Sequence, residues 1–163
     1  MIYKNNDFLD IIQDILDNKT VQDLELYKHH YGSNRLEHCL AVSYYSYLIC
    51  KSLHLDYVSV ARAGVLHDLF LYDCECKSSK PKFHIWKHPK LALANAKELF
   101  VLNKKECDIV LKHMWPITPI PPKYLESFIL TFVDKFCAFK EWCTYSKNVV
   151  SCWYLSLFLP KID

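Results

Sequence analysis

Six side chains of the types that bind metal ions follow one another along the chain in a suggestive order. Imidazole nitrogens and carboxylate oxygens are donors that Fe, Mn, Zn, Co and Ni all accept. A carboxylate has two oxygens and can join two cations, whereas neutral imidazoles fill further positions without adding charge. Any one of these histidines alone is more often a hydrogen-bonded core residue, but their joint order predicts a metal centre. The candidate ligands are His38, His67, Asp68, His88, His113 and Asp134.

The adjacent pair His67 and Asp68 sets a condition on the backbone. Neighbouring residues on an α-helix point about 100° apart, so both side chains reach one site only where the helix ends and the chain turns. The polar stretch YDCECKSSKPKFHIWK, residues 72–87, follows closely and contains a proline. We expect it to be a surface excursion that allows such an end.

The elements that must position these residues are expected to be amphipathic helices, because apolar residues recur at spacings of three and four. No segment alternates convincingly as a strand, so the predicted fold class is all-α. Pro89 suits the first turn of its helix, and the segment PITPIPP, residues 116–122, is expected to be a rigid connector. Helices are expected from residue 8, from a Thr20 cap, from Ser33 or Asn34, from Asp56 as far as Phe70, and over 88–100, 103–114 and 123–142.

Composition excludes several classes of function. The chain of 163 residues is 52% hydrophobic and carries a net charge of +2, so neither a disordered protein nor a partner of long nucleic acids is expected. Its two glycines, Gly32 and Gly64, leave no glycine-rich phosphate-binding loop. Most of the eight cysteines lie in helix-patterned apolar segments, where reduced thiols are expected.

Neither end of the chain predicts membrane insertion. The N-terminal segment MIYKNNDFLDIIQDILDNK carries acids within its apolar pattern and lacks the features of a secretory signal. The longest apolar run, VVSCWYLSLFLP at residues 149–160, is too short to span a bilayer as a helix. We therefore expect a cytoplasmic protein without a membrane partner.

The order H, HD, H, H, D resembles the HD-domain superfamily of metal-dependent phosphohydrolases. The phrases RLEHCLAV, GVLHDLFLYD, KHPKLALANA, LKHMWP and VDKFCAFKE are similar to small stand-alone bacterial-type members. The resemblance covers residues 35–142 and implies one HD-type helical bundle over residues 1–163, with an apolar helix or tail at 145–163. It implies two divalent metal ions. The first would be held by His38, His67, Asp68 and Asp134, and the second by Asp68, His88 and His113.

The chain departs from the better-characterised branches of that superfamily. Leu69, Phe70 and Leu71 follow the HD pair, where hydrolases of guanosine polyphosphates and deoxynucleotide monophosphates tend to place an acid. Cyclic-dinucleotide phosphodiesterases of the HD-GYP type have a lysine at the position of Leu71, and the chain has no GYP. Those specific activities lose support, and the substrate stays open.

The expected function is that of a phosphomonoesterase or phosphodiesterase acting on a nucleotide or another small phosphorylated metabolite through a metal-activated water. His67 and Asp68 are the central catalytic candidates. Arg35 would share the helix face of His38 and meet a substrate phosphate; the competing interpretation is a surface salt bridge with Glu37 or Asp56. Lys135 would neutralise phosphate or be a solvated lysine.

Two other functions stay open at this point. The domain could be a non-catalytic ligand sensor or scaffold, with its C-terminal apolar segment sealing a homodimer. It could also be a two-iron oxygenase, because a related cage in the same superfamily oxidises a polyol.

Other interpretations of single residues are disfavoured. His84 is the rival of His88 but lacks a following proline to orient it. Cys39 diverges from His38 on a helix and is expected to be a buried thiol, not a nucleophile. A zinc knot is disfavoured by its tight Cys-x-Cys spacing. Its ligands would be Asp73, Cys74, Glu75, Cys76, His84 and His88.

Overall fold

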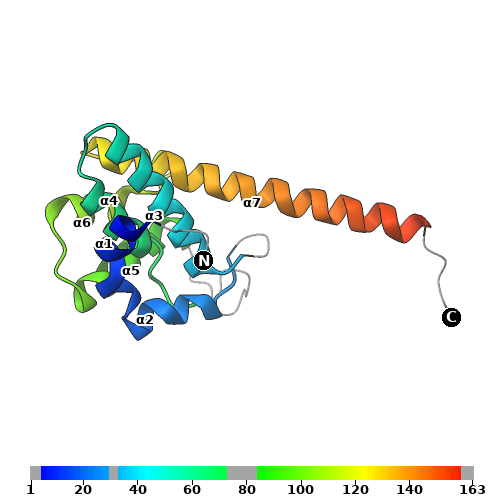
Figure 1. Ribbon diagram of the computed structural model, residues 1–163, viewed down its shortest axis with the longest axis horizontal. Coiled ribbons are helices and arrows are strands. Elements are labelled where there is room, and N and C mark those ends of the chain that lie inside the picture. The colour runs from blue at the N-terminus through cyan, green and yellow to red at the C-terminus, as the bar shows by residue number, and fades with distance from the viewer. Residues whose placement is uncertain (1–4, 30–32, 73–83, 159–163) are drawn as a thin grey trace.

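The fold is built from helices, as predicted. The structure, a computed structural model, describes residues 5–29, 33–72 and 84–158, with the side chains of residues 85 and 147–158 left out of the description. Within these ranges no strand occurs, and the elements follow one another around a common core (Figure 1). They are α1 (Asn6–Leu16), α2 (Lys19–Gln22), the 3-10 helix η1 (Asp23–Leu26), α3 (Arg35–Ser52), α4 (Tyr57–Leu66), α5 (His84–Leu99), α6 (Lys104–Lys112) and α7 (Leu125–Phe158).

Local capping explains where three of the helices begin. The Asn34 side chain accepts a hydrogen bond from the backbone N–H of Glu37, whose carboxylate accepts one from the backbone of Asn34, so a capping box opens α3. Asn103 and Glu106 form the same box at the start of α6. Asp56 caps α4. These three predicted starts are confirmed.

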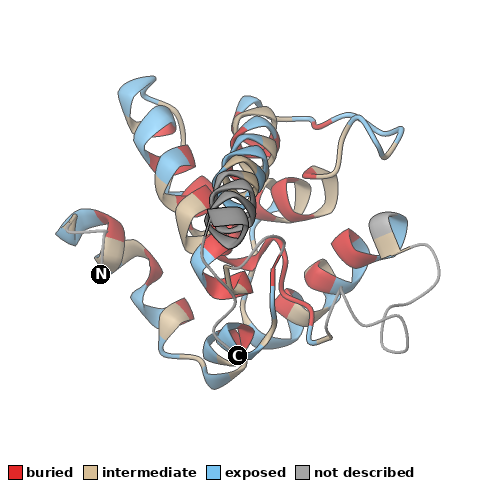
Figure 2. Ribbon diagram, turned by 90° about the vertical axis from the view of Figure 1, so that its right-hand side faces the viewer, coloured by how far each residue is buried: buried red, intermediate tan, exposed pale blue. Residues whose placement is uncertain are grey.

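The core lies where α3 and α4 pack against each other and against α7 and the N-terminal helices. Buried residues lie mainly where these helices pack together, whereas exposed residues lie on their outer sides (Figure 2). Gly64 makes the close approach of α3 and α4 possible, since a Cβ atom placed there would lie 2.6 Å from the Cα of Ser43. Central core residues include Phe8, Ile12, Val42, Tyr47, Val60, Leu66, Ile109 and Leu130.

Two boundaries around the candidate ligands differ from the prediction. Helix α4 ends at Leu66, whereas the apolar pattern favoured an end near Phe70. Helix α5 begins at His84, so Pro89 lies inside the helix instead of in its first turn. The expected excursion over 72–87 is therefore shorter at its end, and residues 73–83 lie outside the described ranges.

The ends of the chain also depart from expectation. The second N-terminal helix is capped by Asn18 and not by Thr20, and Leu26 in the following turn is 78% exposed. Helix α7 continues to Phe158 and projects away from the other helices (Figure 1). In the described part of the chain, no helix has the length and apolar character needed to cross a membrane. The described cysteines are free, as expected: Cys39, Cys50, Cys107, Cys137 and Cys143.

Candidate metal centre

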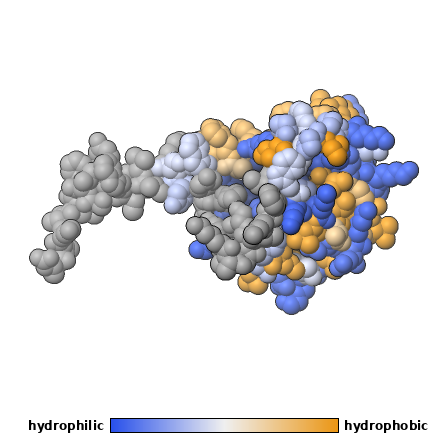
Figure 3. Space-filling model, turned by 180° about the vertical axis from the view of Figure 1, so that it is seen from behind, coloured by the Kyte–Doolittle hydropathy of each residue, from blue (hydrophilic) through white to orange (hydrophobic). Residues whose placement is uncertain are grey.

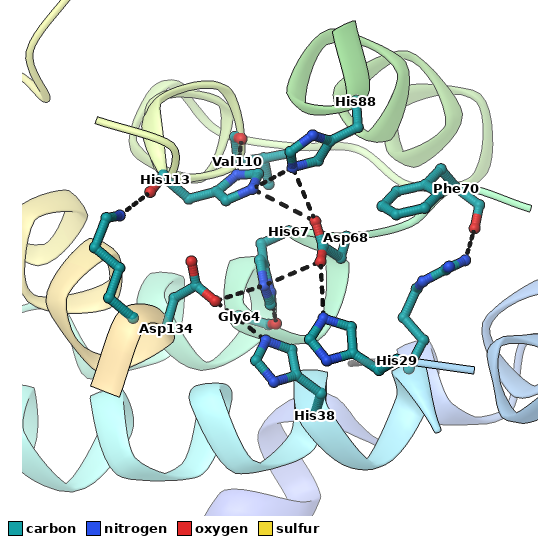
Figure 4. A network of polar contacts seen from close by, with 12 residues as sticks. His29, His38, Gly64, His67, Asp68, Phe70, His88, Val110, His113 and Asp134 are labelled. Carbon is teal, nitrogen blue, oxygen red and sulfur yellow. Dashed lines mark hydrogen bonds and ion pairs between the residues drawn. The ribbon is translucent and has the colours of Figure 1, made fainter. Parts of the chain in front are cut away.

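The six predicted ligands come together in the interior around Asp68 (Figure 4). Five separate segments bring them there: α3 carries His38, the turn after α4 carries the HD pair, and α5, the end of α6 and α7 carry the rest. All are buried except Asp134, which is half-buried. Helical elements that are distant in sequence therefore build one buried polar cluster.

The end of α4 allows both members of the HD pair to face this cluster. His67 is the cap residue after Leu66, and the backbone then turns, with Leu69 N–H donating to Leu66 O and Phe70 N–H donating to Asp68 O. The helix therefore ends earlier than the predicted Phe70, and this early end meets the condition that the adjacent pair His67 and Asp68 sets on the backbone. Leu69 is held beyond the turn because the Asn95 side chain donates to its carbonyl.

Asp68 lies between two groups of histidines. Its Oδ1 atom is 3.3 Å from His88 Nε2 and 3.4 Å from His113 Nε2. Its Oδ2 atom is 3.8 Å from His67 Nε2. The ligand atoms of Asp68, His88 and His113 lie within 4.8 Å of one another, as do those of His38, His67 and Asp68.

Asp134, on α7, joins the group of His38, His67 and Asp68. Its Oδ1 atom is 3.1 Å from His38 Nε2 and 3.7 Å from His67 Nε2. The first predicted group of ligands, His38, His67, Asp68 and Asp134, is therefore assembled, and it shares Asp68 with the other group.

Three histidines are held by Nδ1 in an orientation that would suit metal ligands. In each ring Nδ1 donates to a backbone carbonyl, which can only accept, so the neutral ring keeps a lone pair on Nε2. Metal-bound histidines almost always donate their other ring N–H in this way, which fixes the tautomer and the ring orientation. The pairs are His67 with Gly64 O at 2.8 Å, His113 with Val110 O at 2.8 Å and His88 with His84 O at 3.1 Å.

Several buried donor atoms of the cluster lack a hydrogen-bond partner or face another acceptor, and a cation would supply the missing contact. The buried His67 Nε2 and Asp68 Oδ1 atoms make no hydrogen bond. His88 Nε2 and His113 Nε2 face each other at 2.9 Å, although both neutral rings present lone pairs there. A buried polar atom left without a partner costs about 1–3 kcal/mol. Divalent cations between these donors would satisfy all four atoms.

Charge in the site also favours cations. Burial would raise the pKa of Asp68, but His67 and the other imidazoles around it hold that pKa well below its usual range. Burial would also raise the pKa of Asp134, but the hydrogen bond from His38 and the nearby His67 ring outweigh it, so this pKa is also well below normal. Both carboxylates are therefore ionised in the interior.

The same contacts act on the histidines. Burial would lower the pKa of His38, but its hydrogen bonds to Asp134 and Glu141 raise that pKa to about 10. In His113, burial dominates and lowers the pKa. Without a metal the cluster thus holds protons that a cation would displace.

Two residues of the site were missed by the sequence analysis. The His29 ring stacks on the His38 ring at a centroid distance of 3.8 Å, and Glu141 contacts both rings. Glu141 lies seven residues after Asp134, two helical turns along the same face of α7, so the sequence spacing could have placed it near Asp134. No such spacing pointed to His29, because it precedes α3 outside any periodic segment.

Arg35 does not lie at the mouth of the site, where the sequence analysis expected it to meet a substrate phosphate. Its side chain is fully buried, and Nη1 and Nη2 donate to Phe70 O at 2.6 Å and Tyr72 O at 2.9 Å. The guanidinium lies over the Phe70 ring, 3.8 Å from its centroid. The burial of this side chain is also at odds with the alternative of a surface salt bridge. Arg35 fixes the segment that follows Asp68.

Lys135 links the end of α6 to α7 through hydrogen bonds instead of facing solvent. Its Nζ atom donates to His113 O at 3.0 Å and Thr131 O at 3.3 Å. The side chain is half-buried, and burial lowers its pKa. These contacts tie the end of α6 to α7 beside Asp134, and they differ from both sequence interpretations of this lysine.

The structure distinguishes His88 from its rival His84 at the start of α5. His88 turns toward Asp68, whereas His84 Nδ1 contacts the Tyr72 hydroxyl at 2.7 Å. Residues 73–76 of the disfavoured zinc knot lie outside the described ranges. Cys39 is buried, as expected for a core thiol.

Comparisons of the chain with protein-family models, with curated proteins and with solved structures find no match. The site is therefore interpreted from its own residues. These comprise two groups of three or four nitrogen and oxygen donors that share one carboxylate. Such an arrangement could hold one or two divalent cations.

Proposed function

We propose that this protein is a metal-dependent phosphohydrolase of the HD-domain type, acting as a phosphomonoesterase or phosphodiesterase on a nucleotide or another small phosphorylated metabolite. The observation that carries the proposal is the position of Asp68, whose two oxygens face separate groups of imidazoles. The residue order in the sequence supports it independently.

Each ligand has a distinct part in this proposal. His38, His67 and Asp134 would hold the first cation, His88 and His113 the second, and Asp68 would belong to both. Bound divalent cations would supply a water nucleophile near neutral pH and neutralise charge on the phosphoryl oxygens. The chain itself holds the ligands in place through Nδ1–H donors directed at backbone carbonyls.

The nearby cationic side chains have structural contacts instead of a free face toward substrate. Arg35 and Lys135 both donate to backbone carbonyls. The phosphate charge would therefore be met at the metal centre, and selectivity for the rest of the substrate would come from other groups.

Elemental analysis followed by a phosphate-release screen tests the proposal. Protein loaded with Mn, Fe, Co or Ni should hydrolyse an aryl phosphate or a member of a nucleotide panel. Asp68→Ala should abolish the activity, whereas Asp10→Ala, which changes an exposed carboxylate on α1, should not. Activity that survives Asp68→Ala would contradict the assignment.

A two-iron oxygenase is the second candidate, favoured by the histidine-rich surroundings of Asp68, where four Nε2 atoms lie within 3.8 Å of its oxygens. Oxygen consumption by the iron-loaded protein, without phosphate release, would select it. Tight nucleotide binding with neither activity would select the non-catalytic sensor or scaffold.

A further inference from the structure

We propose that His29 is a further ligand of the first metal site and that Glu141 positions it together with His38. The inference rests on the metal centre of the proposed function, but not on phosphate hydrolysis. It adds an imidazole from the segment before α3 and an outer carboxylate from α7 to the six residues that the sequence predicts.

The contacts of Asp68 are the first support. Its Oδ1 atom faces His88 and His113, at 3.3 and 3.4 Å. Its Oδ2 atom faces His67 and His29, both at 3.8 Å (Figure 4). Each oxygen of the shared carboxylate therefore has a pair of Nε2 atoms around it. His29 Nε2 therefore lies as close to Oδ2 as the Nε2 atom of His67, which is a predicted ligand.

Glu141 is the second support. Its Oε2 atom is 3.2 Å from His29 Nδ1, and its Oε1 atom is 3.0 Å from His38 Nδ1. A carboxylate only accepts, so both Nδ1 atoms carry hydrogen, and Nε2 is the atom that each ring could offer to a cation. One carboxylate thus fixes two tautomers, as outer carboxylates do for metal-bound histidines.

The packing of the two rings is the third support. The His29 and His38 rings are stacked, with an interplanar angle of 16°. Nearly parallel rings that are held through Nδ1 by one carboxylate direct their Nε2 atoms toward the same region. His38 Nε2 lies 3.1 Å from Asp134 Oδ1, so this region is the first site.

The backbone places His29 for this role. The His29 N–H donates to Ser33 O at 2.9 Å, and the Arg35 N–H donates to Tyr27 O at 3.0 Å. These bonds hold the segment before α3 beside the first turn of that helix, where His38 projects. Only 9% of His29 is exposed, so the imidazole is directed inward and not toward solvent.

A separate cation between His29, His38 and Glu141 is the competing interpretation, because their ligand atoms also lie within 4.8 Å of one another. The Nδ1 to carboxylate distances of 3.0 and 3.2 Å are those of N–H···O hydrogen bonds. A cation there would have to displace both protons. The contacts therefore favour a positioning carboxylate.

With His29 as a ligand, the two metal sites would have different numbers of protein donors. The first would have five protein donors, whereas the second would have three. A cation held by more protein donors would keep fewer positions for water or substrate. Substrate would therefore meet the metal centre mainly on the side of His88 and His113. The first-site donors are His29, His38, His67, Asp68 and Asp134.

Cobalt titration of the full chain tests the role of His29, with visible absorption and competition against a chelator as the readouts. His29→Ala and His29→Gln should still bind two Co²⁺ ions, with one binding step weakened about 10- to 100-fold and an altered spectrum. Glu141→Gln should weaken the same step. His54→Asn, which changes an exposed histidine outside the site, should match the wild type. Thermal melts of the metal-free variants identify any that fail to fold.

The outcomes separate this inference from the proposed function. Unchanged cobalt affinity and spectrum in a folded His29→Gln variant would overturn the inference, even if the wild type releases phosphate. Loss of a third cobalt ion, with the first two unchanged, would also overturn it. A cobalt step that depends on His29 in a protein without hydrolase activity would support the inference and contradict the proposed function.

Discussion

The second histidine pair decides how many cations the cluster holds. His88 Nε2 and His113 Nε2 lie 2.9 Å apart and both face Asp68 Oδ1, whereas the other ligands lie on the side of Oδ2. We predict that His88→Ala and His113→Ala each reduce the metal content from two ions to one. Elemental analysis of the variants after refilling with excess metal measures this. Two retained ions would contradict the assignment of these histidines.

Arg35 is predicted to matter for stability and not for phosphate binding. Its guanidinium makes two hydrogen bonds to carbonyls and lies over Phe70. Hydrogen bonds to charged groups contribute about 1.5–3 kcal/mol, so Arg35→Ala should lower the free energy of unfolding by about 3 kcal/mol. Lys19→Ala is the control, because Lys19 forms an exposed ion pair with Asp23 at 3.2 Å and its loss should cost about 1 kcal/mol or less. Equal losses in urea denaturation would contradict this account of Arg35.

The grouping of the six candidate ligands was predictable from the types and order of these residues in the sequence. Their side chains lie together in the structure. His29 could not be found, since its part depends on Glu141, which is 112 positions away. Arg35 was placed on the correct helix face relative to His38, but the carbonyls of the segment after Asp68 take its donors. Only the tertiary structure shows which groups a buried arginine side chain contacts.

At the scale of elements, the contact between α3 and α4 controls the geometry of the site. A Cβ atom at Gly64 would lie 2.6 Å from Ser43 Cα and 2.8 Å from Ser43 Cβ. Helix propensity alone favours Gly64→Ala by about 1 kcal/mol. The clash acts against this, because overpacking typically costs about 1–3 kcal/mol. We predict a net loss of stability and weaker metal binding, since α3 carries His38 and α4 leads into the HD pair. An exposed Ser52→Ala substitution on α3 is the control, and a stabilised Gly64→Ala protein would contradict the prediction.

The start of α7 is tied to α4 and α6 by Glu126. Its Oε1 atom accepts from Lys105 Nζ at 2.7 Å and from the backbone N–H of Asp56 at 3.1 Å. Burial would raise the pKa of Glu126, but the hydrogen bonds from Lys105 and from backbone N–H groups, together with the Lys105 charge, outweigh it and hold that pKa below its usual range. The carboxylate is therefore more acidic when folded than when unfolded, and its stabilisation is lost as the pH falls.

Glu126→Gln tests this link. At pH 6 the variant should be less stable than the wild type, because the charged acceptor is absent. The difference should narrow as the pH falls below about 4, where the wild-type carboxylate is protonated as well. Urea denaturation across this pH range measures the difference. A gap that stays constant with pH would contradict the role given to the carboxylate.

Element boundaries were predictable where local hydrogen bonds set them. The starts of α3 and α6 follow from capping boxes within four residues of sequence. The end of α4 did not follow, because Leu69 and Phe70 continue the apolar period while the Asn95 side chain and the Arg35 guanidinium hold their carbonyls in a turn. The early start of α5 was missed because Pro89 is typical of a first turn, yet its helix begins five residues earlier.

At the scale of the whole molecule, α7 connects the site to the surface. It begins at the Glu126 anchor, carries Asp134 and Glu141 past the metal centre and then projects from the other helices (Figure 1). The face shown in Figure 3 mixes hydrophilic and hydrophobic side chains instead of presenting a surface of one kind. On α7, the aromatic side chains of Phe132, Phe136 and Phe139 are each more than half exposed.

The all-α class was predictable at this scale, because helical periodicity runs through most of the chain. The projection of α7 was not, since the apolar pattern after Trp142 permitted either a helix or a tail. The assembly of five segments around Asp68 also required the structure. Residue order predicts which side chains meet, but packing determines which oxygen of Asp68 each histidine faces.

Anomalous X-ray scattering from crystals grown with manganese or cobalt distinguishes a two-metal centre from a one-metal centre. We expect two peaks, one on each side of the Asp68 carboxylate. The first should lie among His38, His67 and Asp134, and the second between His88 and His113. A single peak, or a metal-saturated crystal in which His88 and His113 turn away from Asp68, would contradict the two-metal centre.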